Sequence, residues 1–444
     1  MCAKELHRIS AVEALKLIRD GDLTIEAYAS ALLDRIKKRD SVVKAWAYLD
    51  PDSVITQAKA LDKVPLPERG PLHGIPVGVK DVYLTKDMPT AYNSEIYRGQ
   101  PTVTADAAAV ITLRAAGALI FGKTTTTEFA STVVGGPSTN PHDPTRTPGG
   151  SSSGSGAAVG DYQVPIALGT QTVGSTIRPG SFNGIYAFKP TWGAISREGF
   201  AQYSMTCDTV GLYARSVEDL DLLASVFKLA DDEVVSTQPL DLKGAKVAFC
   251  KTHVWPEAGP GTRNAFSKAQ ELLASRGANV CELDLPSEFA AISRWHEIIL
   301  AGEGRSSFLG NYSLAKDKLH SSIQAHVENA QRFTKKQLLE SYDGCARLRP
   351  LWDEIASKYD VVITPSVVDE APVGIERTGS AVFNGMWTIL HAPCLNLPGF
   401  AGENGLPVGL TLVGGRYHDL GVLRAGKTLG EIFERDGGFV SKIP

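Results

Sequence analysis

The strongest constraint on the fold is an alternation of short apolar segments with longer amphipathic ones along most of the chain. The short segments are rich in β-branched residues and are punctuated by glycine, which predicts buried strands. They lie at 72–80, 118–121, 164–168, 245–250, 278–284, 360–364 and 407–413. Helices are predicted at 10–40, 106–116, 151–160, 262–276, 286–357 and 419–434. This alternation predicts an α/β fold with a largely buried sheet, built as one large domain.

The composition is that of a soluble globular protein. Of 444 residues, 43% are hydrophobic and 21% charged, and the net charge of −4 favours neither nucleic acid nor an anionic membrane as a partner. The first residues contain no apolar run, and no stretch of about 18 apolar residues occurs, so neither a secretory signal nor a membrane span is expected. Six cysteines lack CxxC spacing. This argues against a disulfide framework and a zinc site and favours a reduced, cytoplasmic setting.

Two glycine- and serine-rich loops stand out against this pattern. The first overlaps residues 135–160, which are dense in Gly and Ser, and includes a loop with little periodicity from about 123 to 150; loops of such length inside a compact domain are typically functional. Its Gly-Ser run 149–156 leads into a predicted helix start at 157–159, where backbone N–H groups stabilise an anion. The second loop, 169–178, follows a buried strand. If the two loops converge at a strand end, they form a pocket rich in hydroxyls and backbone donors.

Lys80 closes the apolar strand predicted at 72–80. A lysine in this place is often a side chain that snorkels at the rim of a sheet. Beside a serine-rich pocket a second interpretation is open, because burial can lower the pKa of a lysine by several units from about 10.4, and the neutral amine is a base. Asp81 points to the opposite side of the strand, so it need not keep Lys80 charged.

Two other patterns in the chain fit their usual context poorly. Residues 117–124 match the phosphate-loop pattern, but a helix precedes them and a threonine-rich loop follows, so nucleotide binding is not expected. Residues 150–154 match the nucleophile elbow G-x-S-x-G, but no downstream histidine has a recognisable setting. A Ser–His–Asp hydrolase is therefore not expected either.

Taken together, these segments resemble the amidase signature family. The resemblance spans nearly the whole chain, and its specificity comes from the combined spacing of several motifs. These are 74–81 (GIPVGVKD), 122–129 (GKTTTTEF), 148–154 (PGGSSSG), 169–179 (GTQTVGSTIRP), 208–211 (DTVG), 214–219 (ARSVED) and 360–365 (DVVITP). Within the family the chain looks most like bacterial malonamidase-type enzymes, which share the sequence motif Gly-Thr-Gln-Thr-x-Gly-Ser and the segment 94–99 (SEIYRG).

The resemblance implies a fold and a set of catalytic roles. The fold is a single amidase domain over 1–444 with a twisted mixed sheet covered by helices; its parts are N-terminal helices (1–62), a signature core (65–220) and a C-terminal α/β part (221–444). The implied nucleophile is Ser175, the bridging residue is Ser151 behind a cis peptide bond, and the base is Lys80. The backbone N–H groups implied to stabilise the oxyanion belong to Thr172, Val173, Gly174 and Ser175. No metal or cofactor is implied.

The acyl pocket is less constrained than the triad. Many family members have Gly-Gly-Ser at the nucleophile, whereas this chain has Val173-Gly174-Ser175, and the side chain at 173 requires a negative φ and is expected to reshape the pocket. Arg178 is either a clamp for a substrate carboxylate, as the malonamidase resemblance suggests, or a residue that holds the loop. Ala130 falls where the family lines its acyl pocket, and a small residue there leaves room for a bulky group.

The predicted function is that of a serine-type amidohydrolase, which cleaves the C–N bond of a small amide or carbamate through an acyl-enzyme on Ser175. Hydrolysis of urethanes as the main activity is one alternative, because a carbamate presents the same carbonyl and leaving amine. The other alternative is the catalytic subunit of a tRNA-dependent amidotransferase, which needs partner chains. We expect a small-molecule amide or carbamate as substrate and neither nucleic acid nor a membrane as a partner. A homodimer is a possible assembly.

Overall fold

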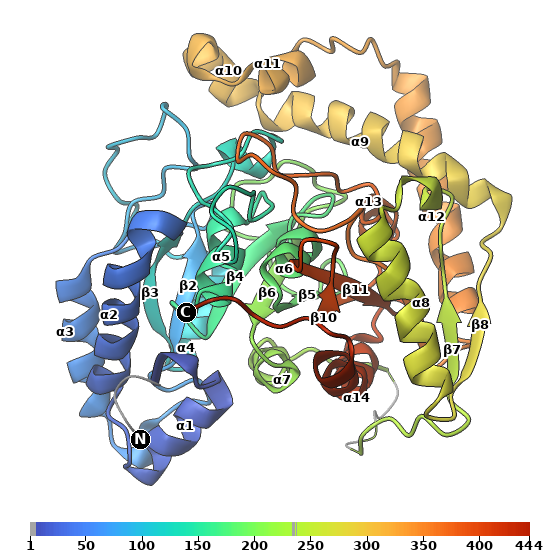
Figure 1. Cartoon of the computed structure of the whole chain (residues 1–444). Coiled ribbons are helices and arrows are strands. Elements are labelled where there is room, and N and C mark those ends of the chain that lie inside the picture. Colours follow the sequence, from blue (N-terminus) through green and yellow to red (C-terminus); the bar gives the residue numbers. More distant parts are fainter. Residues whose placement is uncertain (1–5, 233–235, 237) are drawn as a thin grey trace.

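Eleven strands of the computed structural model, which describes residues 6–232, 236 and 238–444, join in one sheet that crosses the molecule (Figure 1). The strands are β1 (Trp46–Tyr48), β2 (Pro76–Lys80), β3 (Leu119–Thr124), β4 (Ile166–Gln171), β5 (Tyr186–Lys189), β6 (Thr209–Ala214), β7 (Lys246–Phe249), β8 (Asn279–Glu282), β9 (Val361–Pro365), β10 (Cys394–Ala401) and β11 (Pro407–Val413). Their order in the sheet is β1-β3-β2-β4-β6-β5-β10-β11-β9-β7-β8.

The sheet is mixed. β2 runs parallel to both of its neighbours, β3 and β4, and the group β9-β7-β8 is also parallel, whereas β4, β6, β5, β10, β11 and β9 pair in antiparallel fashion. β2 and β4 therefore end at the same edge of the sheet. Lys80 is the last residue of β2, and the loop that follows β4 carries Ser175, so the topology places two predicted catalytic residues at one edge of the sheet.

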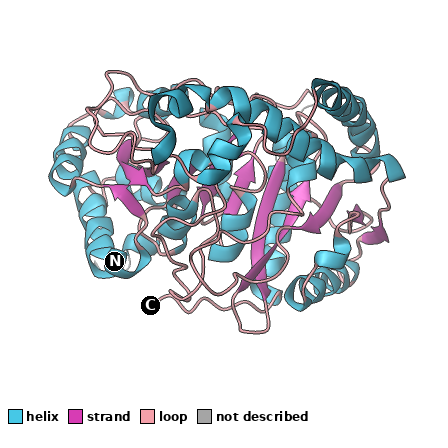
Figure 2. Ribbon diagram, turned by 90° about the horizontal axis from the view of Figure 1, so that it is seen from above, coloured by secondary structure: helices cyan, strands magenta, loops and turns pink. Residues whose placement is uncertain are grey.

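Helices lie on both sides of the sheet (Figure 2). They are α1 (Ala11–Asp20), α2 (Ile25–Val43), α3 (Pro51–Asp62), α4 (Ala108–Ala115), α5 (Ser153–Gly160), α6 (Ile177–Asn183), α7 (Val217–Val226), α8 (Pro260–Ala274), α9 (Ile292–Ser307), α10 (Leu309–Ala315), α11 (Ser321–Val327), α12 (Lys335–Ala356), α13 (Gly385–Ile389) and α14 (Asp419–Asp436). Every residue of α5 and α6 is buried. Residues 292–356, with helices α9–α12, form a helical cap at one end of the molecule (Figure 1).

The predicted α/β fold with one large sheet is confirmed, and so are several local predictions. The N-terminal helices begin where capping residues predict: Ser10 and Glu13 form a reciprocal capping box at α1, and the side chain of Thr24 accepts the N–H of Ala27 at α2. The apolar segment predicted at 72–80 contains β2. No helix in the described ranges is long and apolar enough to cross a membrane.

Other local predictions were wrong or incomplete. The second loop, predicted at 169–178, is shorter than expected, because β4 continues through Gln171 and α6 begins at Ile177. The side-chain oxygen of Gln171 accepts the N–H groups of Thr176 (2.9 Å) and Ile177 (3.0 Å), so a glutamine from the preceding strand supplies the helix cap. The strands β5, β6 and β10 were not predicted, because they are buried on both faces and lack the alternation that marks a half-exposed strand.

Candidate active site

Lys80 is held without solvent contact at the end of β2. Its Nζ lies 2.7 Å from Ser151 Oγ and 2.7 Å from Thr170 Oγ1. Burial holds the pKa of Lys80 well below its usual range, and the charge of Asp208 opposes this only in part. Asp81 pairs instead with the buried Lys123 at 3.0 Å. Burial therefore favours the neutral amine of Lys80, which lies close to a serine hydroxyl; both are conditions for the predicted role as a base.

Ser151 follows a cis peptide bond from Gly150, as the resemblance implies, and is 3% exposed. Its loop is tied to β4 by Ser152, whose hydroxyl donates to the carbonyl of Thr170 and accepts the N–H of the same residue, both at 3.2 Å. The carbonyl of Ser151 accepts the N–H of Thr127. These contacts hold the Ser151 hydroxyl between the sheet and the loop that follows β3.

Ser175 lies in the short segment 172–176 between β4 and α6; its residues 172–175 are called the nucleophile loop below, after the role predicted for Ser175. In the part of the chain that the structure describes, none of the four backbone N–H groups of this loop donates a hydrogen bond to another residue. The adjacent N–H groups of Thr176 and Ile177 are satisfied by Gln171. A row of unused donors next to a buried serine is the arrangement that stabilises an oxyanion.

The nucleophile loop is fixed by its carbonyl groups and side chains. The carbonyl of Val173 accepts the hydroxyl of Thr388 at 2.7 Å, the carbonyl of Thr172 accepts Nε2 of His296 at 3.1 Å, and Gln171 donates to Thr388 at 3.0 Å. Two carbonyls of the loop are thus engaged by distant side chains, whereas its four N–H groups donate to none of the described residues. No motif pointed to Thr388 or His296, which lie more than a hundred positions away from the loop.

Arg178 is 5% exposed, and its contacts go to the protein. Nη1 donates to the carbonyl of Gly379 at 2.9 Å, and Nη2 donates to the carbonyl of Gly150 at 2.6 Å and to the hydroxyl of Thr378 at 3.2 Å. Ala130 is also buried and has a φ of 56°, next to Phe129 with a φ of 47°. Left-handed backbone at two consecutive non-glycine residues is uncommon and marks a constrained turn.

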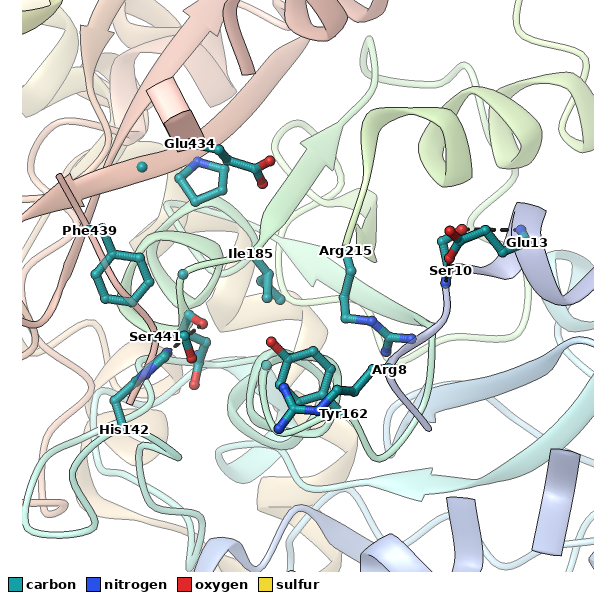
Figure 3. Close-up of a pocket in the computed structure, with 15 residues that line it drawn as sticks. Arg8, Ser10, Glu13, His142, Tyr162, Ile185, Arg215, Glu434, Phe439 and Ser441 are labelled. Atoms are coloured by element: carbon teal, nitrogen blue, oxygen red, sulfur yellow. Dashed lines mark hydrogen bonds between the residues drawn. The ribbon is translucent and has the colours of Figure 1, made fainter. Parts of the chain in front are cut away.

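A hollow of about 340 Å³, shown in Figure 3, lies elsewhere. Its lining includes the carboxyl-terminal ends of α5 and α6, whereas Ser151 and Ser175 precede the amino-terminal ends of these helices. Arg8 and Arg215 stand over the ring of Tyr162 in this hollow, at 4.8 and 5.4 Å from its centre. None of the three triad residues lines it. Among the residues described, no group of three or more His, Cys, Asp or Glu side chains is arranged to hold a metal ion.

Comparison with known families agrees with this geometry: residues 27–423 match the family model described as Amidase. The chain belongs to the amidase family. Among its relatives are glutamyl-tRNA(Gln) amidotransferase A subunits. The one from Acidothermus cellulolyticus is 32% identical, over 98% of this chain and 96% of the relative. The one from Thermobifida fusca is 31% identical over 95% of each chain.

Solved structures give the same family and fold. A crystal structure described as an amidase superposes with a TM-score of 0.85 and 29% identity, and the match covers 97% of this chain and all of the other. The crystal structure of the corresponding glutamyl-tRNA(Gln) amidotransferase subunit from Thermotoga maritima has a TM-score of 0.76 and 25% identity, over 95% of this chain and 94% of that one. The match along the whole length agrees with one amidase fold.

Proposed function

We propose that this amidase-family protein hydrolyses the C–N bond of a small amide or carbamate, with Ser175 as the nucleophile, Ser151 as the proton-transferring bridge and Lys80 as the base. The observation that carries the proposal is the buried Lys80, with its Nζ 2.7 Å from the Ser151 hydroxyl, beside a loop whose four N–H groups are unused by the described residues. The alternative of a lysine that snorkels at the rim does not fit a side chain with no exposure.

The reaction follows from these positions. As Ser175 attacks the carbonyl carbon, its proton passes to Ser151, and the Ser151 proton passes to the lone pair of the neutral Lys80. Lys80 can at the same time donate an N–H to Thr170, which lies 2.7 Å from Nζ and orients the amine. The N–H groups of the nucleophile loop stabilise the oxyanion of the tetrahedral intermediate.

Collapse of the intermediate releases the leaving group. The proton held by Lys80 returns through Ser151 to the leaving nitrogen, which departs as ammonia or an amine and leaves an acyl group on Ser175. Water then attacks the acyl-enzyme and passes its proton through Ser151 to Lys80. As the second intermediate collapses, that proton returns through Ser151 to the oxygen of Ser175, and the acid is released. A carbamate undergoes the same steps, because oxygen in place of carbon on the acyl side changes neither the carbonyl nor the leaving amine.

For Arg178, the loop-holding role is favoured over the carboxylate clamp within this proposal. Its guanidinium donates to the carbonyls of Gly150 and Gly379, so it joins the loop before Ser151 to a segment near residue 379. If so, Arg178→Lys should lower kcat for carboxylated and neutral amides by the same factor. A loss confined to the KM of carboxylated amides would instead support the clamp and a malonamidase-type substrate.

A second candidate is the catalytic subunit of an amidotransferase. It is favoured by one observation, the full-length similarity at 32% and 31% identity to two glutamyl-tRNA(Gln) amidotransferase A subunits. Such a role and the hydrolase role use the same triad and differ in the need for partner chains. The difference can therefore be measured with the purified protein alone.

The test is a substrate panel of aliphatic amides, anilides, carbamates, carboxylated amides and glutamine, together with labelling by a fluorophosphonate. Wild-type protein should be labelled and should hydrolyse at least one amide or carbamate without a partner; Ser175→Ala should do neither. Ser275→Ala, which removes an exposed serine hydroxyl, is the matched control and should behave like the wild type. If glutamine is the one substrate turned over, and only after partner chains are added, the result would favour the amidotransferase. Unchanged hydrolysis by Ser175→Ala would exclude the mechanism.

A further inference from the structure

Asp208 begins the segment 208–211, one of the segments that carry the family resemblance, but it has no part in the mechanism above. It is 2% exposed and lies beside the nucleophile loop. Its Oδ1 accepts a 2.6 Å hydrogen bond from the hydroxyl of Thr172, and its Oδ2 accepts the N–H groups of Tyr203 (2.7 Å) and Ser204 (3.0 Å). One carboxylate thus joins the first residue of the nucleophile loop to the turn 203–208.

The turn 203–208 is itself fixed to the helical cap. The hydroxyls of Ser204 and Thr206 donate to the two carboxylate oxygens of Glu303 on α9, and Thr206 adds its N–H at 3.1 Å. Tyr342 on α12 donates its hydroxyl to Glu303 at 2.9 Å. Glu303 is buried, so these bonds are shielded from water and hold the turn firmly. Asp208 therefore has a rigid support from which to hold the nucleophile loop.

We propose that Asp208 is a positioning residue of the hydrolysis, which acts by holding Thr172 and so keeps the N–H groups of the nucleophile loop on the place where the oxyanion forms. This inference rests on the proposed function. The plainer role, a cap of the turn 203–208, needs only the bonds from Tyr203 and Ser204. The bond from Thr172 is dispensable for that role, and this difference makes the two roles separable.

The charges that face Asp208 give a second readout. Burial raises the pKa of Asp208 to about 6, and the charge of Arg197 opposes this. The charges of Asp208 and Lys80 act on each other, and Glu303 on α9 and Tyr83 after β2 lie in the same buried region. The negative charge of Asp208 raises the pKa of Lys80, although burial lowers that pKa more. Asp208→Asn should therefore shift the acid limb of the kcat/KM profile to lower pH, which a role confined to folding would not do.

The closing experiment removes only the bond between Thr172 and Asp208. Thr172→Val should lower kcat on an anilide about tenfold or more with KM changed less than about twofold, because a displaced oxyanion donor weakens transition-state binding. Thr172→Ser keeps the hydroxyl and should recover kcat to within about threefold. Thr262→Val removes another buried threonine hydroxyl, one that donates to the carbonyl of Val367 and not to Asp208, and should keep the wild-type kcat.

The outcomes distinguish a failure of the positioning role of Asp208 from a failure of the proposed hydrolysis. A double variant Thr172→Val/Asp208→Asn should lose little more activity than the worse single variant, because both act through one bond. Wild-type kcat in Thr172→Val, or losses that multiply in the double variant, would overturn the positioning role while the hydrolase activity stands. A wild-type protein that neither hydrolyses the substrate panel nor reacts with a fluorophosphonate would refute the proposed function itself, and the positioning role with it.

Discussion

Gly174 precedes Ser175, the proposed nucleophile, and a single methyl group added at Gly174 should disable the proposed site. A Cβ at Gly174 would lie 2.3 Å from Oδ1 of Asn384 and 2.9 Å from Cβ of Ala381. The backbone of Gly174 is outside the left-handed region, so the cost of Gly174→Ala comes from contact and not from φ. Asn384 is 3% exposed and donates its amide to the carbonyl of Ser366 at 3.0 Å, which limits how far it can yield.

The magnitude follows from the displacement that relieves this contact. To restore an ordinary contact distance, the nucleophile loop and Asn384 must separate by about 1 Å, and a misplacement of about 1 Å in an active site lowers a rate about 100-fold. We expect kcat to fall by about that factor, KM to change much less, and the free energy of unfolding to fall by about 1–3 kcal/mol from overpacking. The assays are steady-state hydrolysis of an anilide and unfolding in urea.

Two further variants test the reasoning behind Gly174→Ala. The double variant Gly174→Ala/Asn384→Ala removes the Asn384 atoms nearest to the new Cβ and should restore part of the lost kcat, although the contact of that Cβ with Ala381 remains tight. Gly421→Ala in α14 is the matched control, because its Cβ would meet nothing closer than Asp231 Oδ2 at 3.6 Å. It should keep the wild-type kcat and gain about 0.5–1 kcal/mol of stability. Normal kcat in Gly174→Ala, or a loss that Asn384→Ala leaves untouched, would refute the steric argument.

Three further predictions concern buried charge and pH. Lys80→Met should abolish hydrolysis. Because burial lowers the pKa of Lys80, the folded wild-type protein binds fewer protons than its unfolded chain. The difference in Tm between the wild type and Lys80→Met should therefore shift in favour of the wild type as the pH rises to about 10.4. In the wild type, kcat/KM should fall as the pH is lowered and Lys80 takes up a proton, and a profile that instead rises toward acid would contradict a neutral base. Lys123→Met leaves the carboxylate of Asp81 buried without its partner and should lower the free energy of unfolding in urea by about 3–5 kcal/mol. The double variant Lys123→Met/Asp81→Asn should recover much of that loss. Equal losses in both variants would show that the unpaired charge of Asp81 is not the cause of the destabilisation.

Residues close together in the sequence were the ones best predicted. The start of α1 could be placed because Ser10 and Glu13 satisfy each other within one turn, and β2 could be placed because its apolar segment is short and glycine-punctuated. The first residue of α6 was missed because its cap, Gln171, belongs to the preceding strand and is not a residue type that usually marks a helix start. Sequence patterns that predict helix starts rely on hydrogen bonds within one turn of the helix. They could not predict this cap, because its side chain belongs to another element.

The type of fold could be inferred from the sequence because segment alternation is a property of the chain, and the resemblance of its motifs to a family singled out Lys80, Ser151 and Ser175 as the proposed triad. The full burial of Lys80 and its approach to Ser151 could not, since these residues lie 71 positions apart and meet only through the order of β3, β2 and β4. The supports of the nucleophile loop also emerged only from the folded protein. Thr388, His296 and Asp208 reach the loop from distant segments, and hydrogen bonds of such long range follow from sheet topology, which no local pattern encodes.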